Sequence, residues 1–138
     1  MDRRALFLAA SACAWLLAGC AGQSPFEPAP VRFGQVDFLE SLESPRSPID
    51  VRFARDAFSP DDALVATVFL DPSLVGKNRA ARLIVLDSTG RAAASLDLSD
   101  VRNTEMLVHV QLRGARAGNY TLRVEAGGLS ADKPFSVR

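Results

Sequence analysis

Short runs of alternating hydrophobic and polar residues recur from about residue 31 to the C-terminus. Ile49-Asp50-Val51-Arg52-Phe53 alternates without a break, and three later runs have the same two-residue period. Their hydrophobic positions are Met106, Val108 and Val110, then Tyr120, Leu122 and Val124, and finally Phe135 and Val137. A period of two places every second side chain on the same face of a β-strand. These runs therefore predict strands with one buried face.

Other runs complete the predicted strand set. Val31 to Phe38 alternates in its first and last parts, Ala63 to Leu70 and Arg82 to Leu86 are apolar enough for central strands, and Ala92 to Leu98 is weaker. Turn residues separate the runs, and Asp87-Ser88-Thr89-Gly90 is the clearest hairpin because Gly90 can adopt a positive φ. Seven or eight short strands predict an all-β fold, an antiparallel β-sandwich of about 100 residues.

The first 20 residues have a different pattern. Arg3 and Arg4 precede a segment from Ala5 to Ala18, 14 residues without a charge. As a helix this segment would span about 21 Å, which is short of the roughly 30 Å of a bilayer core. It is therefore typical of the hydrophobic region of a signal peptide and not of a membrane span.

The sequence Leu17-Ala18-Gly19-Cys20 follows and resembles the lipobox of bacterial lipoproteins. The resemblance implies that the Cys20 thiol receives a diacylglycerol, that residues 1–19 are cleaved as a signal peptide, and that the new amino group is acylated, for example with palmitate. Cys13 would leave with the signal. Ala21, in place of Asp, implies the periplasmic face of the outer membrane. The alternative is an ordinary secretory signal that happens to contain a cysteine.

Two features of the N-terminal region refine this picture. Arg3-Arg4 ahead of Leu6-Phe7-Leu8 is also similar to a twin-arginine signal, so the export route stays open between that and general secretion. Residues 20–30 hold three prolines within six positions, which predicts a stiff tether of roughly 30 Å at about 3.1 Å per residue. Residues 31–138 then form the sandwich domain.

The C-terminal part resembles bacterial immunoglobulin-like domains. Ala117-Gly118-Asn119-Tyr120-Thr121-Leu122-Arg123-Val124 is similar to their penultimate strand, and Phe135-Ser136-Val137 to their closing strand. The resemblance runs from about Phe58 to Arg138 and implies a buried Tyr120 ring whose hydroxyl bonds to nearby backbone. The cysteine pair and core tryptophan of antibody domains are absent. The resemblance implies an immunoglobulin-like β-sandwich and says nothing of function.

Charge and composition exclude several classes of protein. Lys and Arg total 16, as do Asp and Glu, so the net charge is zero. A nucleic-acid-binding protein would need a strongly basic face. One His and two Cys exclude mechanisms that need two imidazoles, as well as four-cysteine zinc sites. We therefore predict no catalytic residue, no metal site and no cofactor.

Three weaker signals have a structural and a functional interpretation. His109 falls on the polar face of its strand, where a solvated side chain is expected. Six aspartates lie near strand ends, where they favour turn formation, although loops of a sandwich can also gather carboxylates around Ca²⁺. They are Asp61, Asp62, Asp71, Asp87, Asp97 and Asp100. Arginine outnumbers lysine 14 to 2, and a mixed surface is favoured over a face for anionic ligands. That face would comprise Arg79, Arg82, Arg91, Arg113, Arg116 and Arg123.

These features together predict a non-enzymatic periplasmic lipoprotein held on the membrane at Cys20. Its sandwich would bind or support another envelope component, a protein or a glycan. A small lipoprotein inhibitor or chaperone that presents a loop or an edge strand to a client is the alternative, and an envelope hydrolase is a third. The surface used should lie in the long inter-strand loops, Asp71 to Arg79 and Ser99 to Glu105, because the inner faces form the core.

Overall fold

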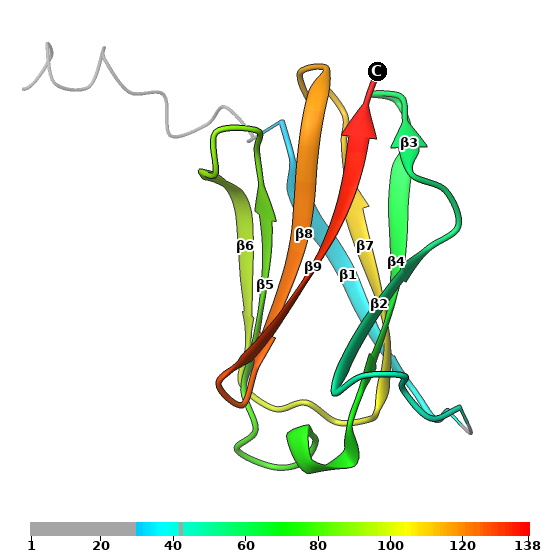
Figure 1. Cartoon of the computed structure of the whole chain (residues 1–138), viewed down its shortest axis with the longest axis vertical. Coiled ribbons are helices and arrows are strands. Elements are labelled where there is room, and N and C mark those ends of the chain that lie inside the picture. Colours follow the sequence, from blue (N-terminus) through cyan, green and yellow to red (C-terminus); the bar gives the residue numbers. More distant parts are fainter. Residues whose placement is uncertain (1–29, 42) are drawn as a thin grey trace, which may run out of the picture.

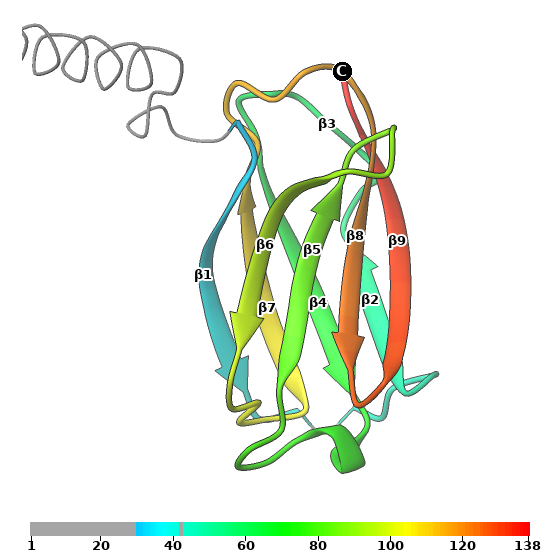
Figure 2. The same ribbon diagram turned by 90° about the vertical axis from the view of Figure 1, so that its left-hand side faces the viewer.

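Nine β-strands in two facing sheets make up the part of the chain that the computed structural model describes, residues 30–41 and 43–138 (Figure 1). The strands are β1 (Arg32–Leu39), β2 (Ile49–Phe53), β3 (Ala57–Phe58), β4 (Ala63–Leu70), β5 (Ala81–Leu86), β6 (Ala92–Leu98), β7 (Glu105–Gln111), β8 (Gly118–Ala126) and β9 (Leu129–Val137). The first sheet has the order β1-β7-β4-β2 and the second the order β3-β9-β8-β5-β6. Figure 2 shows β1, an edge strand of the first sheet, side by side with β6, an edge strand of the second. The predicted all-β sandwich is confirmed.

The number of strands differs from the seven or eight expected. The additional strand is β3, which is only two residues long and pairs in parallel with the end of β9, whereas every other pairing is antiparallel. Two residues are too few for an alternating pattern. β9 is also longer than its predicted part, because it begins at Leu129 and continues through Pro134. Proline is tolerated there because β3 pairs only with the last residues of β9, so that β9 is the edge strand of its sheet at Pro134.

Six strands follow the order of an immunoglobulin fold, whereas the edge strands β1, β3 and β6 differ from it or extend it. In that fold strands A, B, E and D form one sheet, and C, F and G form the other. Here β2, β4 and β7 take the places of A, B and E, and β5, β8 and β9 those of C, F and G. The place of strand D, next to β7, is taken by β1 from the N-terminal side. The immunoglobulin-like topology therefore reaches back to β2, beyond the Phe58 boundary seen in the sequence.

The alternating runs bury their hydrophobic side chains between the two sheets, as predicted. All eight hydrophobic positions of the three C-terminal runs are buried, and Met106, Val108, Leu122 and Val124 have no exposed surface. Aromatic rings close one end of this core. Phe53, Phe58 and Phe135 meet edge to face with centroids 5.8–6.4 Å apart, and Tyr120 stacks on Phe135 at 5.6 Å. Such pairs add about 0.5–1.5 kcal/mol beyond the area that they bury.

A β-bulge explains why the first strand alternates only in its two parts. Phe33 pairs with Val110 and Val36 with Val108, so Gly34 and Gln35 together face the single residue His109. The extra residue shifts the alternation by one position. Phe33 and Val36 can therefore both pack against the core although they are three positions apart.

The tyrosine corner implied by the family resemblance is present. The Tyr120 hydroxyl donates a hydrogen bond of 2.8 Å to the carbonyl of Arg116, four residues upstream, while the ring is buried. This bond satisfies the one polar atom of an otherwise apolar side chain. It also fixes the path of the chain from the β7–β8 loop into β8.

The backbone of the β8–β9 hairpin favours glycine at both turn positions, and at one of them packing requires it as well. Gly127 has φ +57° and Gly128 has φ +78°, the left-handed region that side chains with a Cβ avoid. A Cβ on Gly127 would also lie 2.5 Å from Leu74 Cδ2, whereas a Cβ on Gly128 would meet no atom within 4 Å. Leu74, from the short helix η1 (Pro72–Leu74), packs directly on this turn.

We expect Gly127→Ala to destabilise the domain more than Gly128→Ala. Both variants place alanine at positive φ, which costs about 1–2 kcal/mol, but only Gly127→Ala also displaces Leu74, for a total of about 2–4 kcal/mol. Urea unfolding of the two variants measures the difference. Adding Leu74→Ala to both variants should reduce this difference in unfolding free energy. Equal losses of unfolding free energy for Gly127→Ala and Gly128→Ala would contradict the packing described.

Candidate functional site

The predicted lipidation site, Cys20, lies outside the described residues, as does most of the predicted tether. The described chain begins at Pro30, at the end of the sandwich that also holds the β5–β6 turn, the β7–β8 loop and the C-terminus (Figure 1). Val31, the next residue, is already buried at 3% exposure. The tether therefore joins the domain at this end, which we call the proximal end, and the opposite end is the distal end. No helix among the described residues is long and apolar enough to span a membrane.

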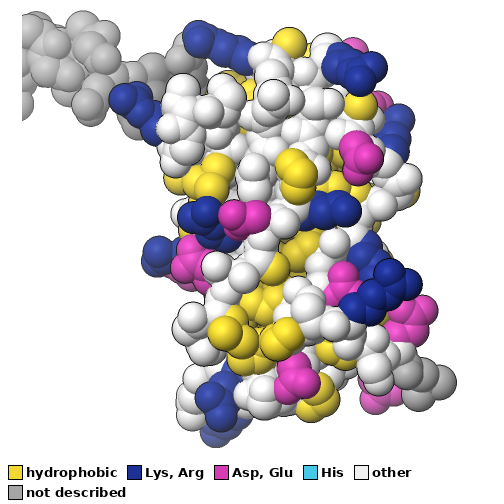
Figure 3. All heavy atoms as spheres, in the orientation of Figure 1, with side chains coloured by type: hydrophobic (Ala, Val, Ile, Leu, Met, Phe, Trp, Pro, Cys, Tyr) yellow, Lys and Arg dark blue, Asp and Glu magenta, His cyan; other side chains and the backbone are white. Residues whose placement is uncertain are grey.

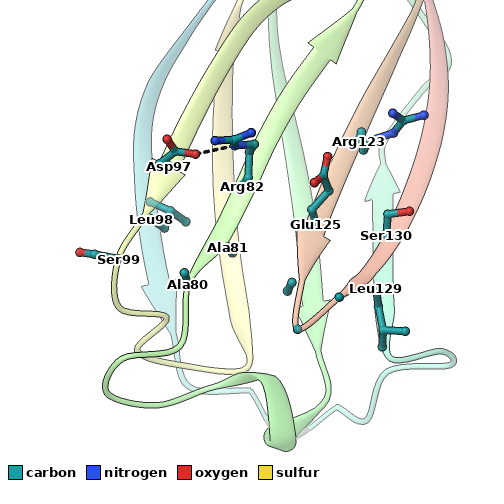
Figure 4. A pocket seen from close by; sticks show the side chains of 13 residues that line it. Ala80, Ala81, Arg82, Asp97, Leu98, Ser99, Arg123, Glu125, Leu129 and Ser130 are labelled. Atoms are coloured by element: carbon teal, nitrogen blue, oxygen red, sulfur yellow. Dashed lines mark hydrogen bonds and ion pairs between the residues drawn. The ribbon is translucent and has the colours of Figure 1, made fainter.

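An open hollow of about 750 Å³ lies on the outer face of the second sheet, near its distal end. It crosses four strands: the start of β5, the end of β6, the end of β8 and the start of β9. Figure 4 shows Arg82, Asp97 and Glu125 on its upper side and Leu129 on its lower rim. The hollow is the candidate binding site of the domain.

The hollow exists because a row of outward positions carries almost no side-chain volume. In the sheet register Arg82 stands opposite Asp97 on one side and Glu125 on the other. The residues just beyond this charged row, at the ends of the strands, are all small: Ala80, Ser99, Gly127 and Gly128. Leu129 beside them is 47% exposed. The site thus has a smooth floor, a polar upper rim and one apolar side chain at its lower rim.

Ion pairs hold the polar rim in place. Arg82 Nε donates to Asp97 Oδ1 at 2.7 Å, and Arg123 donates to both carboxylate oxygens of Asp132 at 2.8 and 3.0 Å. The hydrogen bond with Asp97 raises the pKa of Arg82, and that with Asp132 raises the pKa of Arg123. The same bond lowers the pKa of the Asp132 carboxyl group. In Figure 3, which views the molecule from the side of β9 and β2, side chains of both charges lie among hydrophobic ones.

The hollow does not bring its two serines together with the histidine of β7. Ser99 and Ser130 line the hollow, but His109 belongs to β7 of the other sheet and lies on its outer face, with Nε2 3.5 Å from Asp37 Oδ2. A serine nucleophile needs a base within hydrogen-bonding distance. The predicted place of His109 on the polar face of its strand is confirmed.

Three of the six aspartates near strand ends accept hydrogen bonds within their own turns, and a fourth, Asp100, joins two loops. Asp62 accepts from Ser59 N at 2.7 Å, Asp71 from Ser73 N at 3.0 Å, Asp87 from Thr89 N at 2.9 Å, and Asp100 from Asn78 N at 2.8 Å. Asp97 instead pairs with Arg82, and Asp61 is exposed. Within residues 30–41 and 43–138 no three potential ligands lie close enough together to hold a metal ion.

These turn bonds also shift the titration of three carboxyl groups. A backbone hydrogen bond from Ser59 lowers the pKa of Asp62. The side chains of Ser73 and Thr89 lower the pKa values of Asp71 and Asp87 in the same way. A carboxylate that accepts hydrogen bonds is stabilised in its charged form, whereas a general acid requires a raised pKa.

The two long loops predicted as a binding surface are joined to each other at the distal end. Gly76 N donates to the carbonyl of Val101 at 2.8 Å, and Val101 N donates to the carbonyl of Arg79 at 2.9 Å. Leu74 and Val101 are buried, and Asp71 and Asp100 hold the loops through the bonds above. Charge substitutions at Asp71 and Asp100 would remove these hydrogen bonds, whereas the side chains of Lys77 and Arg102 are exposed.

The six arginines considered as one anionic-ligand face are spread over the molecule. Arg82 and Arg123 lie on the outer face of the second sheet, each in an ion pair. Arg91, Arg113 and Arg116 belong to turns at the proximal end, and Arg79 to a loop at the distal end. The mixed surface favoured by the sequence is the one observed.

The hollow itself was not found from the sequence. Its floor depends on which small residues stand next to one another across four strands, and this requires the register of the sheet. The available signal was the accumulation of small residues at successive strand ends, in Ala80-Ala81, Ser99 and Gly127-Gly128.

Comparisons with known proteins show similarity only to solved structures. No family model matches the chain, and no curated protein does. A lipoprotein from Bacteroides thetaiotaomicron is 8% identical over 72% of this chain and 84% of its own, with a TM-score of 0.43. A conjugative transposon lipoprotein from Bacteroides eggerthii DSM 20697 is 14% identical over 66% and 97%, with a TM-score of 0.40. The sulfur carrier protein SoxY from Chlorobium limicola f thiosulfatophilum is 19% identical over 77% and 88%, with a TM-score of 0.38. Likenesses this weak carry no argument about function.

Proposed function

We propose that this chain is a non-enzymatic lipoprotein of the bacterial envelope whose sandwich binds another envelope component through its distal end. Cys20 carries the lipid, residues 20–30 are the tether, and residues 31–138 are the binding domain. The observation that carries the proposal is Leu17-Ala18-Gly19-Cys20 behind an uncharged segment, which resembles a lipobox. Ala21 after the cysteine favours the periplasmic face of the outer membrane.

The position of the tether supports the distal end as the binding surface. The tether joins at Pro30, and the hollow lies at the other end of strands that are six to nine residues long. At about 3.3 Å per residue this separates the two by roughly 20–30 Å. A domain anchored at one end presents the hollow away from the membrane, toward the rest of the envelope.

The chemistry of the hollow supports a protein segment or a glycan as the partner. The small floor residues let a backbone or a sugar ring approach the sheet closely. Arg82, Asp97 and Glu125 offer both donors and acceptors along one side. Leu129 adds an exposed apolar contact at the rim. A few polar groups around an apolar contact are the usual features of a recognition site.

One observation favours a second candidate function, a lipoprotein inhibitor or chaperone. Leu129 is a large exposed hydrophobic residue at the start of β9. Among the described residues no strand is hydrogen-bonded to the outer edge of β9 at that point, because β3 pairs only with Ser136 and Val137. A client segment in extended conformation could pair with this edge and cover Leu129. The two candidates differ in whether the partner is a single component or a range of clients.

Cross-linking in intact cells tests the proposal. A photo-reactive amino acid at Leu129 should give one discrete adduct with an envelope component, identified by mass spectrometry. The same probe at Ser88, an exposed residue of the proximal β5–β6 turn, is the matched control. A ladder of many proteins from position 129 would favour the chaperone, whereas identical products from both positions would contradict a distal binding surface.

A further inference from the structure

Four arginines surround the proximal end of the sandwich on the side where the tether joins it. Arg32 begins β1, Arg91 closes the β5–β6 turn, and Arg113 and Arg116 belong to the β7–β8 loop, which crosses this end (Figure 2). All four side chains are exposed. We call this group the basic rim.

Among the described residues, the four arginines of the basic rim have no carboxylate partner, unlike the arginines that form the ion pairs of the sandwich. Arg52, Arg55, Arg82 and Arg123 each have a carboxylate oxygen within 3.2 Å. Within the described part of the chain none of the four rim residues has a carboxylate within 4.0 Å, and Arg32 donates instead to Gln111 at 2.7 Å. These guanidinium groups keep donors for a ligand outside the domain.

The acidic residues of the proximal end do not cancel this charge. Asp87 lies in the same turn as Arg91, where it accepts from Thr89 N at 2.9 Å and from Arg91 N at 3.1 Å, and its single charge offsets only one of the four. Asp62 pairs with Arg55 at 3.2 Å, on the β3 side of this end. Asp56 and Asp61 belong to the chain on either side of β3, and Figure 1 places β3 away from the point where the tether joins. The excess of positive charge is therefore on the tether side.

The length of the tether brings this side to the membrane first. The ten residues from Cys20 to Ala29 cannot span more than about 35 Å even when fully extended, and they join the domain beside the basic rim. Charges interact with a surface strongly only within about one Debye length, roughly 8 Å at physiological ionic strength. Because the tether is longer than this range, the proximal end comes within it only when the tether lies along the membrane surface, and it is the part of the domain that does so first.

We propose that the basic rim docks on the anionic phospholipid surface in which the acyl chains of Cys20 are embedded. The domain then stands on its proximal end and directs the hollow outward. This inference rests on the proposed lipid anchor and adds the orientation of the domain. Each arginine near an anionic surface should change the ratio of docked to undocked molecules about five-fold.

The orientation can be measured on the mature lipidated chain in vesicles. A Ser88→Cys variant carries a donor dye at the proximal end and a Ser99→Cys variant carries it at the distal end, because the thiol of Cys20 is blocked by the lipid. Energy transfer to an acceptor on lipid headgroups should be stronger from position 88 than from position 99. It should also be stronger in vesicles with 30% phosphatidylglycerol than in pure phosphatidylcholine, and 0.5 M NaCl should weaken the difference.

Charge variants separate docking from a general effect of net charge. Arg113→Gln with Arg116→Gln should lower the docked-to-undocked ratio about 25-fold, whereas Lys77→Gln with Arg102→Gln, two exposed distal cations, should leave it unchanged. Thermal melting of both variants checks that they remain folded. Equal energy transfer in both vesicle types, or an equal drop of the docked-to-undocked ratio in both double variants, would overturn the docking proposal. Neither result would contradict the proposed lipid anchor. A chain that fails to float with either vesicle would refute the anchor, and docking with it.

Discussion

A Cys20→Ala variant is expected to accumulate as a precursor that still carries residues 1–19. Without the thiol no thioether to diacylglycerol can form, and the cleavage that follows lipidation in the lipoprotein family has no substrate. The mature chain should depend on its acyl groups for membrane retention, since each buried CH₂ contributes about 0.8 kcal/mol and several chains together make release negligible. Electrophoretic size, detergent-phase partitioning and the mass of the N-terminal peptide measure the effect.

Cys13 provides the matched control for this experiment. It lies within the hydrophobic part of the signal segment, seven residues before Cys20. A Cys13→Ala variant should be processed and lipidated like the natural chain, because it changes a thiol that takes no part in the reaction. Mature protein of normal size that partitions into detergent from the Cys20→Ala variant would refute the lipoprotein interpretation.

A Leu122→Ala variant should lose about 2–5 kcal/mol of unfolding free energy, the usual cost of a large-to-small change in a core. Leu122 has no exposed surface, and its strand is central, with β5 on one side and β9 on the other. The facing sheet cannot collapse into the space without disturbing its own packing. Urea unfolding followed by circular dichroism measures the loss, with the midpoint shifting and the slope unchanged.

Arg123→Ala is the control one residue away. Its side chain points to the outer face and pairs with Asp132, and both partners are more than one third exposed. Exposed ion pairs contribute little because water and salt screen them, so the loss should be roughly 0.5 kcal/mol or less. Similar losses for Leu122→Ala and Arg123→Ala would mean that the register of β8 is not the one described.

Strand register was predictable wherever one face of a strand is buried and the other is solvated. The runs around Val108, Leu122 and Phe135 satisfy that condition, and their burial matches the alternation in the sequence. The turn at Asp87 to Gly90 was also predictable, since Gly90 has φ +82° and Asp87 N donates to the carbonyl of Arg91. In these segments local pattern and tertiary packing require the same structure.

Phe69 illustrates what a periodic pattern cannot reveal. It lies in the apolar run of β4, but it pairs with Asp50 on the outer face and is nevertheless only 4% exposed. The guanidinium group of Arg52 covers the ring at 4.3 Å, and Asp50 and Glu43 hold that group at 2.8 and 3.1 Å. This cover depends on the pairing of β2 with β4 and on a loop, and neither is encoded in the sequence of β4.

The hollow and the joined distal loops are long-range features of the same kind. The bridge between Gly76 and Val101 connects segments that are far apart in sequence, and the contact of Gly127 with Leu74 connects the β8–β9 turn to η1. In the sequence each of these contacts is marked only by a small or turn-forming residue. The residue on the other side of the contact is determined by how the two sheets pack together.

The exchange of strand D for β1 determines how the domain bears mechanical load. In an anchored chain any pull on the membrane reaches the sandwich through the N-terminal end of β1, along the direction of the strand. β1 is bonded only to β7 within its sheet, and in this geometry the ladder between them is sheared as a whole instead of being opened one bond at a time. If β1 did separate, β2 to β9 would still contain the A, B, E and C, F, G strands of the fold. Under a strong pull β1 can therefore separate first, while the strands that form the binding end stay folded.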